Sequence, residues 1–215
     1  NPDEVKYYNS GNTVVIPNPA EQDDGRTADL SQKKVLAAGR ISPVKNFEAL
    51  IESWNKIARE HPDWQLHIFG EDYLDTKSKL EYQISENQLE ASVKLMPATD
   101  KMKETMLHYS IYAMTSESEC FPMVLLESLG CGIPVVTFDC PTGPRNIVID
   151  ESDSFLVPNK NLDIFAQKLS ILMDNEALRR IMGANAKENV KRFEIELVMQ
   201  KWQSLFKELS KAKSN

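Results

Sequence analysis

Residues 34–69 read KVLAAGRISPVKNFEALIESWNKIAREHPDWQLHIF, and this stretch decides the fold. Its two ends, 34–39 and 64–69, are short apolar runs typical of buried strands. Between them, residues 46–60 place apolar side chains at helical spacing, with Asn46 as the N-cap and Pro62 beyond the helix end. A crossover helix returns the chain to the edge from which it started, so the two strands must run parallel.

The same alternation continues in both directions along the chain. Further strand-like runs lie at 13–16, 92–96, 111–116, 134–138 and 154–157, and helical patterns lie at 76–86, 100–109 and 122–129. Only helical patterns follow Pro158, at 163–173, 176–191 and 195–209. We therefore expect an α/β fold, a Rossmann-like doubly wound parallel sheet with C-terminal helices. Because no linker interrupts the pattern, residues 1–215 are expected to form a single domain.

The last helical pattern carries a wide apolar stripe, made of Val198, Trp202, Leu205, Phe206 and Leu209. A stripe of this width needs a partner surface. It packs either on the sheet of this domain or on another domain of a longer protein.

The composition excludes several classes of protein. The 41% hydrophobic and 27% charged residues are typical of a globular protein and not of a disordered one. No apolar run is long enough to span a membrane. Its net charge of −7 argues against a uniformly basic nucleic-acid binder. Cys120, Cys131 and Cys140 form no C-x-x-C pair, which indicates reduced thiols in a cytoplasmic protein. The chain starts at Asn1 without a signal peptide, and we expect it to be part of something longer.

In open parallel sheets, ligands bind where the carboxyl ends of the strands meet helix N-termini. Arg40 and Lys45 both follow the strand at 34–39 and precede a helix. Two cations beside a helix N-terminus favour an anion site. The alternative is a surface salt bridge for Arg40 and a solvated Lys45.

The strand at 111–116 is followed by Glu119, and then by a helix that Pro122 is expected to open at its first position. The amides of Met123 and Val124 would then be free to bind an anion. Glu127 is the only charge between Pro122 and residue 139, and a buried carboxylate needs donors. A vicinal diol supplies two hydroxyl donors; pairing with a lysine or a backbone amide is the alternative.

A third loop, residues 139–145, follows the strand at 134–138 and offers Arg145 as a third cation, although an ordinary turn explains its Gly and Pro residues equally well. The sequence contains no G-x-G-x-x-G after a strand, no Walker motif and no D-x-D pair for a divalent metal. His61, His67 and His108 lack ligand spacing, and no histidine near Cys120 in sequence would activate it as a nucleophile.

These segments together resemble a known family. Glu119 and Glu127 have the E-x7-E spacing and are followed by the segment GCGIPVV at 130–136. With Gly39-Arg40, Lys45-Asn46, VVIPNP at 14–19 and TGPRNI at 142–147, the chain resembles the C-terminal, donor-binding domain of family 4 (group 1) retaining glycosyltransferases of GT-B fold. The resemblance covers nearly the whole chain, from about residue 13.

The resemblance implies a role for each matching residue. Arg40 and Lys45 would hold the donor diphosphate and neutralise the leaving group, in place of a metal; Glu119 would lie by the donor sugar, and Glu127 would bind the ribose. Backbone amides of the segment formed by Phe121, Pro122, Met123 and Val124 would contact sugar and phosphates, with the base near residues 93–97. Two departures stand out: Asn146 replaces the usual glutamate of the G-P-x-E-I loop, and Gly70-Glu71-Asp72 lacks a second glycine.

We therefore expect the donor half of a retaining, metal-independent glycosyltransferase that needs no cofactor and acts in the cytoplasm, free or at the membrane through another domain. The family favours UDP-sugars as donors and a polysaccharide or glycolipid as acceptor, bound mainly by an N-terminal domain. The isolated chain would bind nucleotide without transferring sugar. Two alternatives remain: a non-catalytic nucleotide-sugar-binding module, and a GT-B-fold nucleotide-sugar epimerase.

Overall fold

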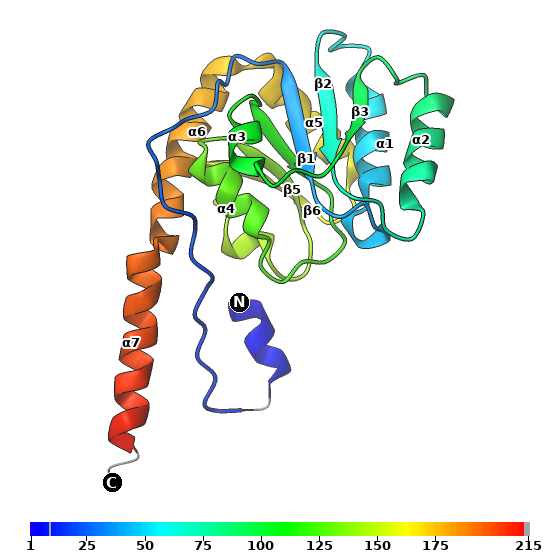
Figure 1. The fold of residues 1–215 in the computed structure, drawn as a ribbon. Helices are drawn as coiled ribbons and strands as arrows, with labels where there is room; N and C mark the ends of the chain where they lie inside the picture. Colours follow the sequence, from blue (N-terminus) through cyan, green and yellow to red (C-terminus); the bar gives the residue numbers. More distant parts are fainter. Residues whose placement is uncertain (9, 213–215) are drawn as a thin grey trace.

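The computed structural model describes residues 1–8 and 10–212, which centre on one sheet of six parallel strands (Figure 1). The strands are β1 (Lys34–Ala38), β2 (Gln65–Phe69), β3 (Val93–Met96), β4 (Ile111–Met114), β5 (Val135–Asp139) and β6 (Ser154–Pro158). Their order in the sheet is β3-β2-β1-β4-β5-β6. The chain therefore leaves β1 in one direction and returns to its other side with β4, which makes the gap between these two strands the switch point of the sheet.

Helices cover both faces of the sheet. They are α1 (Phe47–Ile57), α2 (Thr76–Glu86), α3 (Met102–Met106), α4 (Met123–Gly130), α5 (Leu162–Asp174), α6 (Glu176–Val190) and α7 (Ile195–Ala212). Successive residues of a strand point to opposite faces, and β1 shows this directly. Val35 and Ala37 belong to the core cluster under α1, α2 and α5, while Leu36 and Ala38 belong to the cluster under α3, α4 and α6.

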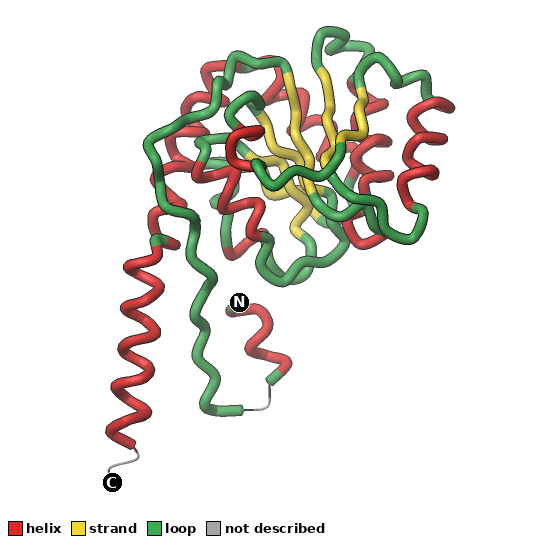
Figure 2. The backbone as a smooth tube through the Cα atoms, in the orientation of Figure 1, coloured by secondary structure: helices red, strands yellow, loops and turns green. Residues whose placement is uncertain are grey.

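The predicted fold class is confirmed, and six of the seven predicted strands are present within one or two residues of their expected bounds. The exception is the run at 13–16, which lies in an irregular segment beside α7 (Figure 2). Its prediction as a strand is wrong because this segment lies away from the sheet and finds no strand to pair with. Val14 is 57% exposed and lines a groove along α7 instead.

The apolar stripe of α7 is not buried on the sheet. Val198 is 2% exposed, but Trp202, Phe206 and Leu209 are 39%, 58% and 53% exposed. Figure 1 shows why: α7 leaves the body of the domain after its first turn and projects away from it. Beyond Val198 the stripe therefore does not pack on the sheet: Leu205 is partly buried in a groove that Val14 also lines, and the other three side chains stay exposed.

The connection from β1 to α1 turns sharply at Asn46. A short 3₁₀ turn, Pro43–Lys45, ends at this residue, and α1 begins after it. Asn46 has φ 49° and ψ 47°, in the left-handed region that asparagine and glycine tolerate best. Its side-chain oxygen accepts a hydrogen bond from the Ala49 amide, so the predicted N-cap is confirmed. One residue thus ends the turn, starts the helix and fixes the position of Lys45.

We expect Asn46→Ala to lower the free energy of unfolding by about 2 kcal/mol, because alanine removes the cap and disfavours the left-handed backbone. Asn46→Gly should lower it by only a few tenths of a kcal/mol, since glycine is tolerated at N-cap positions and in the left-handed backbone conformation. Urea denaturation of the two variants measures the difference. Equal losses in the two variants would contradict a role for the left-handed backbone angle, because alanine and glycine both lack the capping side chain.

Candidate functional site

Three loops leave the carboxyl edge of the sheet, and hydrogen bonds join them to one another. The first loop follows β1 (residues 39–46) and the second follows β4 (residues 115–122). The Glu117 amide donates to the Val44 carbonyl at 2.8 Å, and the Thr115 hydroxyl donates to the Asn46 carbonyl at 2.9 Å. These bonds fix the predicted cations of the first loop relative to the predicted carboxylate of the second.

The third loop (residues 139–146) follows β5 and is bonded to the second in the same way. The Glu119 amide donates to the Pro141 carbonyl at 2.7 Å, and the Thr142 amide returns a bond to the Glu119 carbonyl at 2.6 Å. Glu119 is therefore held by its main chain on both sides. The loops that follow β1, β4 and β5 are therefore in direct contact at one edge of the sheet.

Lys45 and Glu119 form an ion pair at the centre of this edge. The Lys45 Nζ lies 2.6 Å from Glu119 Oε1, and the Ser116 hydroxyl donates to the same oxygen at 2.7 Å. The two charged side chains are only 24% and 11% exposed. A hydrogen bond between charged partners is strong where water is largely excluded. Lys45 is thus not the solvated lysine of the alternative interpretation.

Gly39 makes room for the Lys45 stem, and Gly70 in turn makes room for Gly39. A Cβ on Gly39, where φ is +155°, would lie 3.1 Å from the Lys45 Cε. A Cβ on Gly70 would lie 2.0 Å from the Gly39 carbonyl oxygen. The ends of β1 and β2 therefore approach so closely that only glycine fits at residue 70.

Arg40 is exposed and lies to one side of the Lys45–Glu119 pair. Its guanidinium stacks over the ring of Tyr73, 5.2 Å from the centroid. It lines a cavity of about 260 Å³ with residues that follow the ends of β2 and β3, among them Glu71, Ala98 and Thr99. The surface salt bridge considered for Arg40 is not among the ion pairs of the described residues. Its charge is therefore available to a ligand in this cavity.

The N-terminus of α4 faces the same edge. The helix begins at Met123, so Pro122 is its N-cap residue, with an extended ψ of 99°, rather than its first helical residue as predicted. The first amide bonded within this turn is that of Leu125, to the Pro122 carbonyl. The amides of Met123 and Val124 precede it, at the end where helix amides lack intrahelical acceptors. Phe121 packs edge-on against Phe193, 5.7 Å between centroids, which anchors the loop before the helix.

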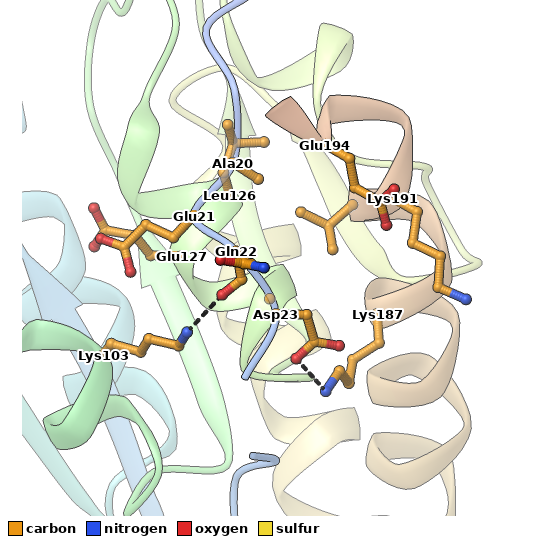
Figure 3. A pocket seen from close by; sticks show the side chains of 12 residues that line it. Ala20, Glu21, Gln22, Asp23, Lys103, Leu126, Glu127, Lys187, Lys191 and Glu194 are labelled. Carbon is orange, nitrogen blue, oxygen red and sulfur yellow. Dashed lines mark hydrogen bonds and ion pairs between the residues drawn. The ribbon is translucent and has the colours of Figure 1, made fainter. Parts of the chain in front are cut away.

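Glu127 lies further along α4, half-buried in a second pocket (Figure 3). Burial raises the pKa of its carboxyl, and the negative charge of Glu21 adds to the effect. Lys103 lines the same pocket but donates to the Gln22 carbonyl at 3.1 Å and pairs with Asp24. The alternative in which a lysine neutralises Glu127 is therefore not what the structure shows.

Arg145, the suggested third cation, is already neutralised. Its Nε donates to Asp139 Oδ1 at 2.8 Å, and a second guanidinium nitrogen contacts the other oxygen. Asn146 donates through Nδ2 to the Thr142 carbonyl and to Asp3, both at 2.8 Å. Both residues therefore shape the third loop, and the hypothesis of a third free cation is wrong.

The remaining candidates from the sequence have structural roles. His67 bonds to the Tyr109 hydroxyl at 2.7 Å and His61 to the Ser170 hydroxyl at 2.8 Å. The three cysteines are free; burial raises the pKa of Cys131 to about 11 and of Cys140 to about 12. The Cys120 pKa is raised as well, first by its hydrogen bond to Glu4. None of the three is an activated nucleophile.

Two features of the site were not predicted. Ser116 is the second of two buried residues directly after β4, and no motif marks its hydroxyl as a partner of Glu119. Glu21 lies in an irregular segment more than a hundred residues from Glu127, and only the tertiary fold brings the two carboxylates into one pocket. Within residues 1–8 and 10–212, no group of three or more potential ligands is placed to hold a metal ion, and no helix is both long and apolar enough to cross a membrane.

We expect the stability of the chain to fall as Glu127 ionises. A carboxyl whose pKa is raised by folding is protonated more readily in the folded state, so stability is lost as pH rises through and above about 4.3, the ordinary glutamate value. Glu127→Gln should therefore gain in melting temperature relative to the parent between pH 4 and 7. Glu52→Gln, at an exposed position on α1, is the control, and a pH-independent difference for Glu127→Gln would contradict the assignment.

Comparisons with known proteins show the family of the chain. The family described as "Glycosyl transferases group 1" matches residues 20–189. An exopolysaccharide phosphotransferase of Streptomyces coelicolor is 33% identical over 197 residues, which cover 91% of this chain and 21% of that protein. The chain spans between 21% and 56% of the length of the first curated relatives it matches.

Solved structures show which part of larger proteins the chain is similar to. TarM of Staphylococcus aureus, solved with UDP among its ligands, superposes with a TM-score of 0.85 and 25% identity, over 95% of this chain and 41% of TarM. The C-terminal domain of a group 1 glycosyl transferase, LpcC of Francisella tularensis, superposes with a TM-score of 0.70 and 22% identity over 84% of this chain and 97% of that one. The chain belongs to the group 1 glycosyltransferases and matches the C-terminal domain of their GT-B fold.

Proposed function

We propose that this chain is the donor-binding domain of a retaining glycosyltransferase and that it binds a nucleoside-diphosphate sugar at the switch point between β1 and β4. The observation that carries the proposal is the convergence of Lys45, Glu119 and the N-terminus of α4 at this point. Such a site offers positive charge for a diphosphate beside a carboxylate for sugar hydroxyls.

Arg40, Lys45 and the amides of Met123 and Val124 hold the diphosphate. Breaking the bond between the sugar and the phosphate leaves negative charge on the diphosphate oxygens. Fixed cations and helix amides stabilise this charge without a metal ion, because they are already oriented toward it. We therefore propose, as the sequence led us to expect, that the enzyme works without a metal ion or another cofactor.

Glu119 orients the sugar. Both of its side-chain hydrogen bonds, from Lys45 and from Ser116, end on Oε1. We assign Oε2 to accept from a hydroxyl of the donor sugar. The Lys45 ammonium has three N–H donors, so it can donate to the phosphates while it still donates to Glu119. The ion pair holds its Nζ at the place where both acceptors are within reach.

Glu127 takes the ribose. Its carboxyl is half-buried and has a raised pKa. A ligand that supplies hydrogen-bond donors would therefore stabilise the carboxylate. A ribose provides two adjacent hydroxyl donors, and one carboxylate can accept both. We infer UDP as the nucleotide, supported by the UDP found with TarM.

The rest of the enzyme supplies the acceptor. We propose that residues 1–215 work as one donor domain in the cytoplasm, beside an N-terminal domain that binds a polysaccharide or glycolipid acceptor. The exposed stripe of α7, from Trp202 to Leu209, is the surface we assign to that domain. The chain alone is expected to bind nucleotide and not transfer sugar, because the acceptor is not held next to the donor.

The first test compares UDP with uridine. Arg40→Ala should weaken UDP at least tenfold in calorimetry and leave uridine nearly unchanged, since the guanidinium serves the phosphates. Arg145→Ala is the matched control, because that arginine is occupied by Asp139. EDTA should change neither affinity. Equal losses of UDP and uridine in Arg40→Ala, or no binding of UDP, GDP or ADP by the parent, would contradict the proposal.

The second test concerns the ribose. Glu127→Ala should weaken UDP binding by about 1.5–3 kcal/mol, the contribution of a hydrogen bond to a charged group. The parent should bind UDP more tightly than 2′-deoxy-UDP, and in Glu127→Ala this preference should disappear. A preference that survives the substitution would assign the 2′-hydroxyl to another residue.

A further inference from the structure

The pairing of β1 with its neighbours changes along the strand. On one side, all five residues of β1 pair with β2, from Lys34–Gln65 to Ala38–Phe69. On the other side, pairing with β4 extends over only two positions, Val35–Ile111 and Leu36–Tyr112. The two central strands therefore diverge before their carboxyl ends, and this divergence opens the edge at which the proposed donor site lies.

The hydroxyl of Tyr112 occupies the place left by this divergence. It donates to the Ala38 carbonyl at 3.1 Å and accepts from the Ala38 amide at 3.3 Å. Ala38 lies on the side of β1 that faces β4, as Lys34 shows by accepting from the Ser110 amide. One side chain thus satisfies both main-chain groups that a continuing strand would otherwise have bonded.

The position of Tyr112 links both halves of the site. Its ring is fully buried in the cluster that includes Leu125 and Leu129 of α4. Its hydroxyl ends directly before Gly39 and Arg40, where the chain leaves the sheet. Burial raises the Tyr112 pKa, with smaller contributions from Glu127 and Glu119, so the phenol stays neutral and lies in the field of both carboxylates.

We propose that Tyr112 is a positioning residue for diphosphate binding: its hydroxyl fixes Ala38, and thereby the direction in which Gly39 and Arg40 leave β1. The proposal rests on the proposed function of Arg40. The exposed Arg40 side chain stacks on Tyr73 and forms no ion pair with the residues that the structure describes, so its placement depends on the backbone that carries it. A phenylalanine would fill the same space but leave two buried main-chain groups without partners.

The test uses Tyr112→Phe and calorimetric titration with UDP and with uridine. We expect UDP to bind five- to tenfold more weakly and uridine to change less than twofold. In the Arg40→Ala background, adding Tyr112→Phe should cost less than a further twofold, because the residue acts through Arg40. Tyr109→Phe is the matched control: Tyr109 is also buried, but its hydroxyl bonds to His67 and not to β1.

The outcomes distinguish a failure of the positioning role from a failure of the proposed function. In the first case the parent binds UDP and Arg40→Ala weakens that binding. The positioning role is then overturned, and the proposed function stands, if Tyr112→Phe leaves the UDP affinity unchanged or lowers the UDP and uridine affinities equally. The same holds if Tyr112→Phe keeps its full effect in the Arg40→Ala background. If the parent does not bind UDP, or Arg40→Ala is without effect, both are overturned. Should Tyr112→Phe unfold, the same titrations are run with all proteins in about 1 M trimethylamine N-oxide, which favours the folded state.

Discussion

The parallel alignment of the strands is the constraint on which the rest of this structure depends. Because every crossover returns the chain to the same edge, all six strands end together, and the loops after β1, β4 and β5 meet although they are far apart in sequence. Main-chain hydrogen bonds, such as that from the Glu117 amide to the Val44 carbonyl, are among the contacts that join them. Side chains at the site can then change without loss of the frame that carries them.

The site handles its two carboxylates differently, and this difference suits two kinds of ligand. Glu119 accepts hydrogen bonds from Lys45 and Ser116 before any ligand binds, and the ion pair offsets the desolvation of its nearly buried charge in the free protein. Glu127 has a raised pKa and faces Glu21. In the proposed complex, a ligand would share the hydrogen-bond donors that Glu119 already has, whereas it would supply new donors to Glu127.

Much of the fold was predictable because its signals are local. The apolar runs of β1 and β2 and the helical spacing from Phe47 to Ile57 need only a few neighbouring residues to be recognised. The run at 13–16 has the same composition as a strand but finds no partner, and composition cannot show this. The E-x7-E spacing located Glu119 and Glu127, but their environments depend on Lys45 and Glu21, which only tertiary contacts bring close. The engagement of Arg145 by Asp139 likewise follows from the shape of the third loop, not from its residue types.

The exposed stripe of α7 has an optical consequence. Of the three tryptophans in the chain, Trp54 and Trp64 are 0% and 3% exposed, whereas Trp202 is 39% exposed and stacks on Phe206 at 5.8 Å. Emission from the first two reports the packing of the sheet against its helices, and water-quenchable emission comes from Trp202 alone. The chain therefore carries its own fluorescent reporter at the surface assigned to the acceptor domain, and its signal is separable from that of the core.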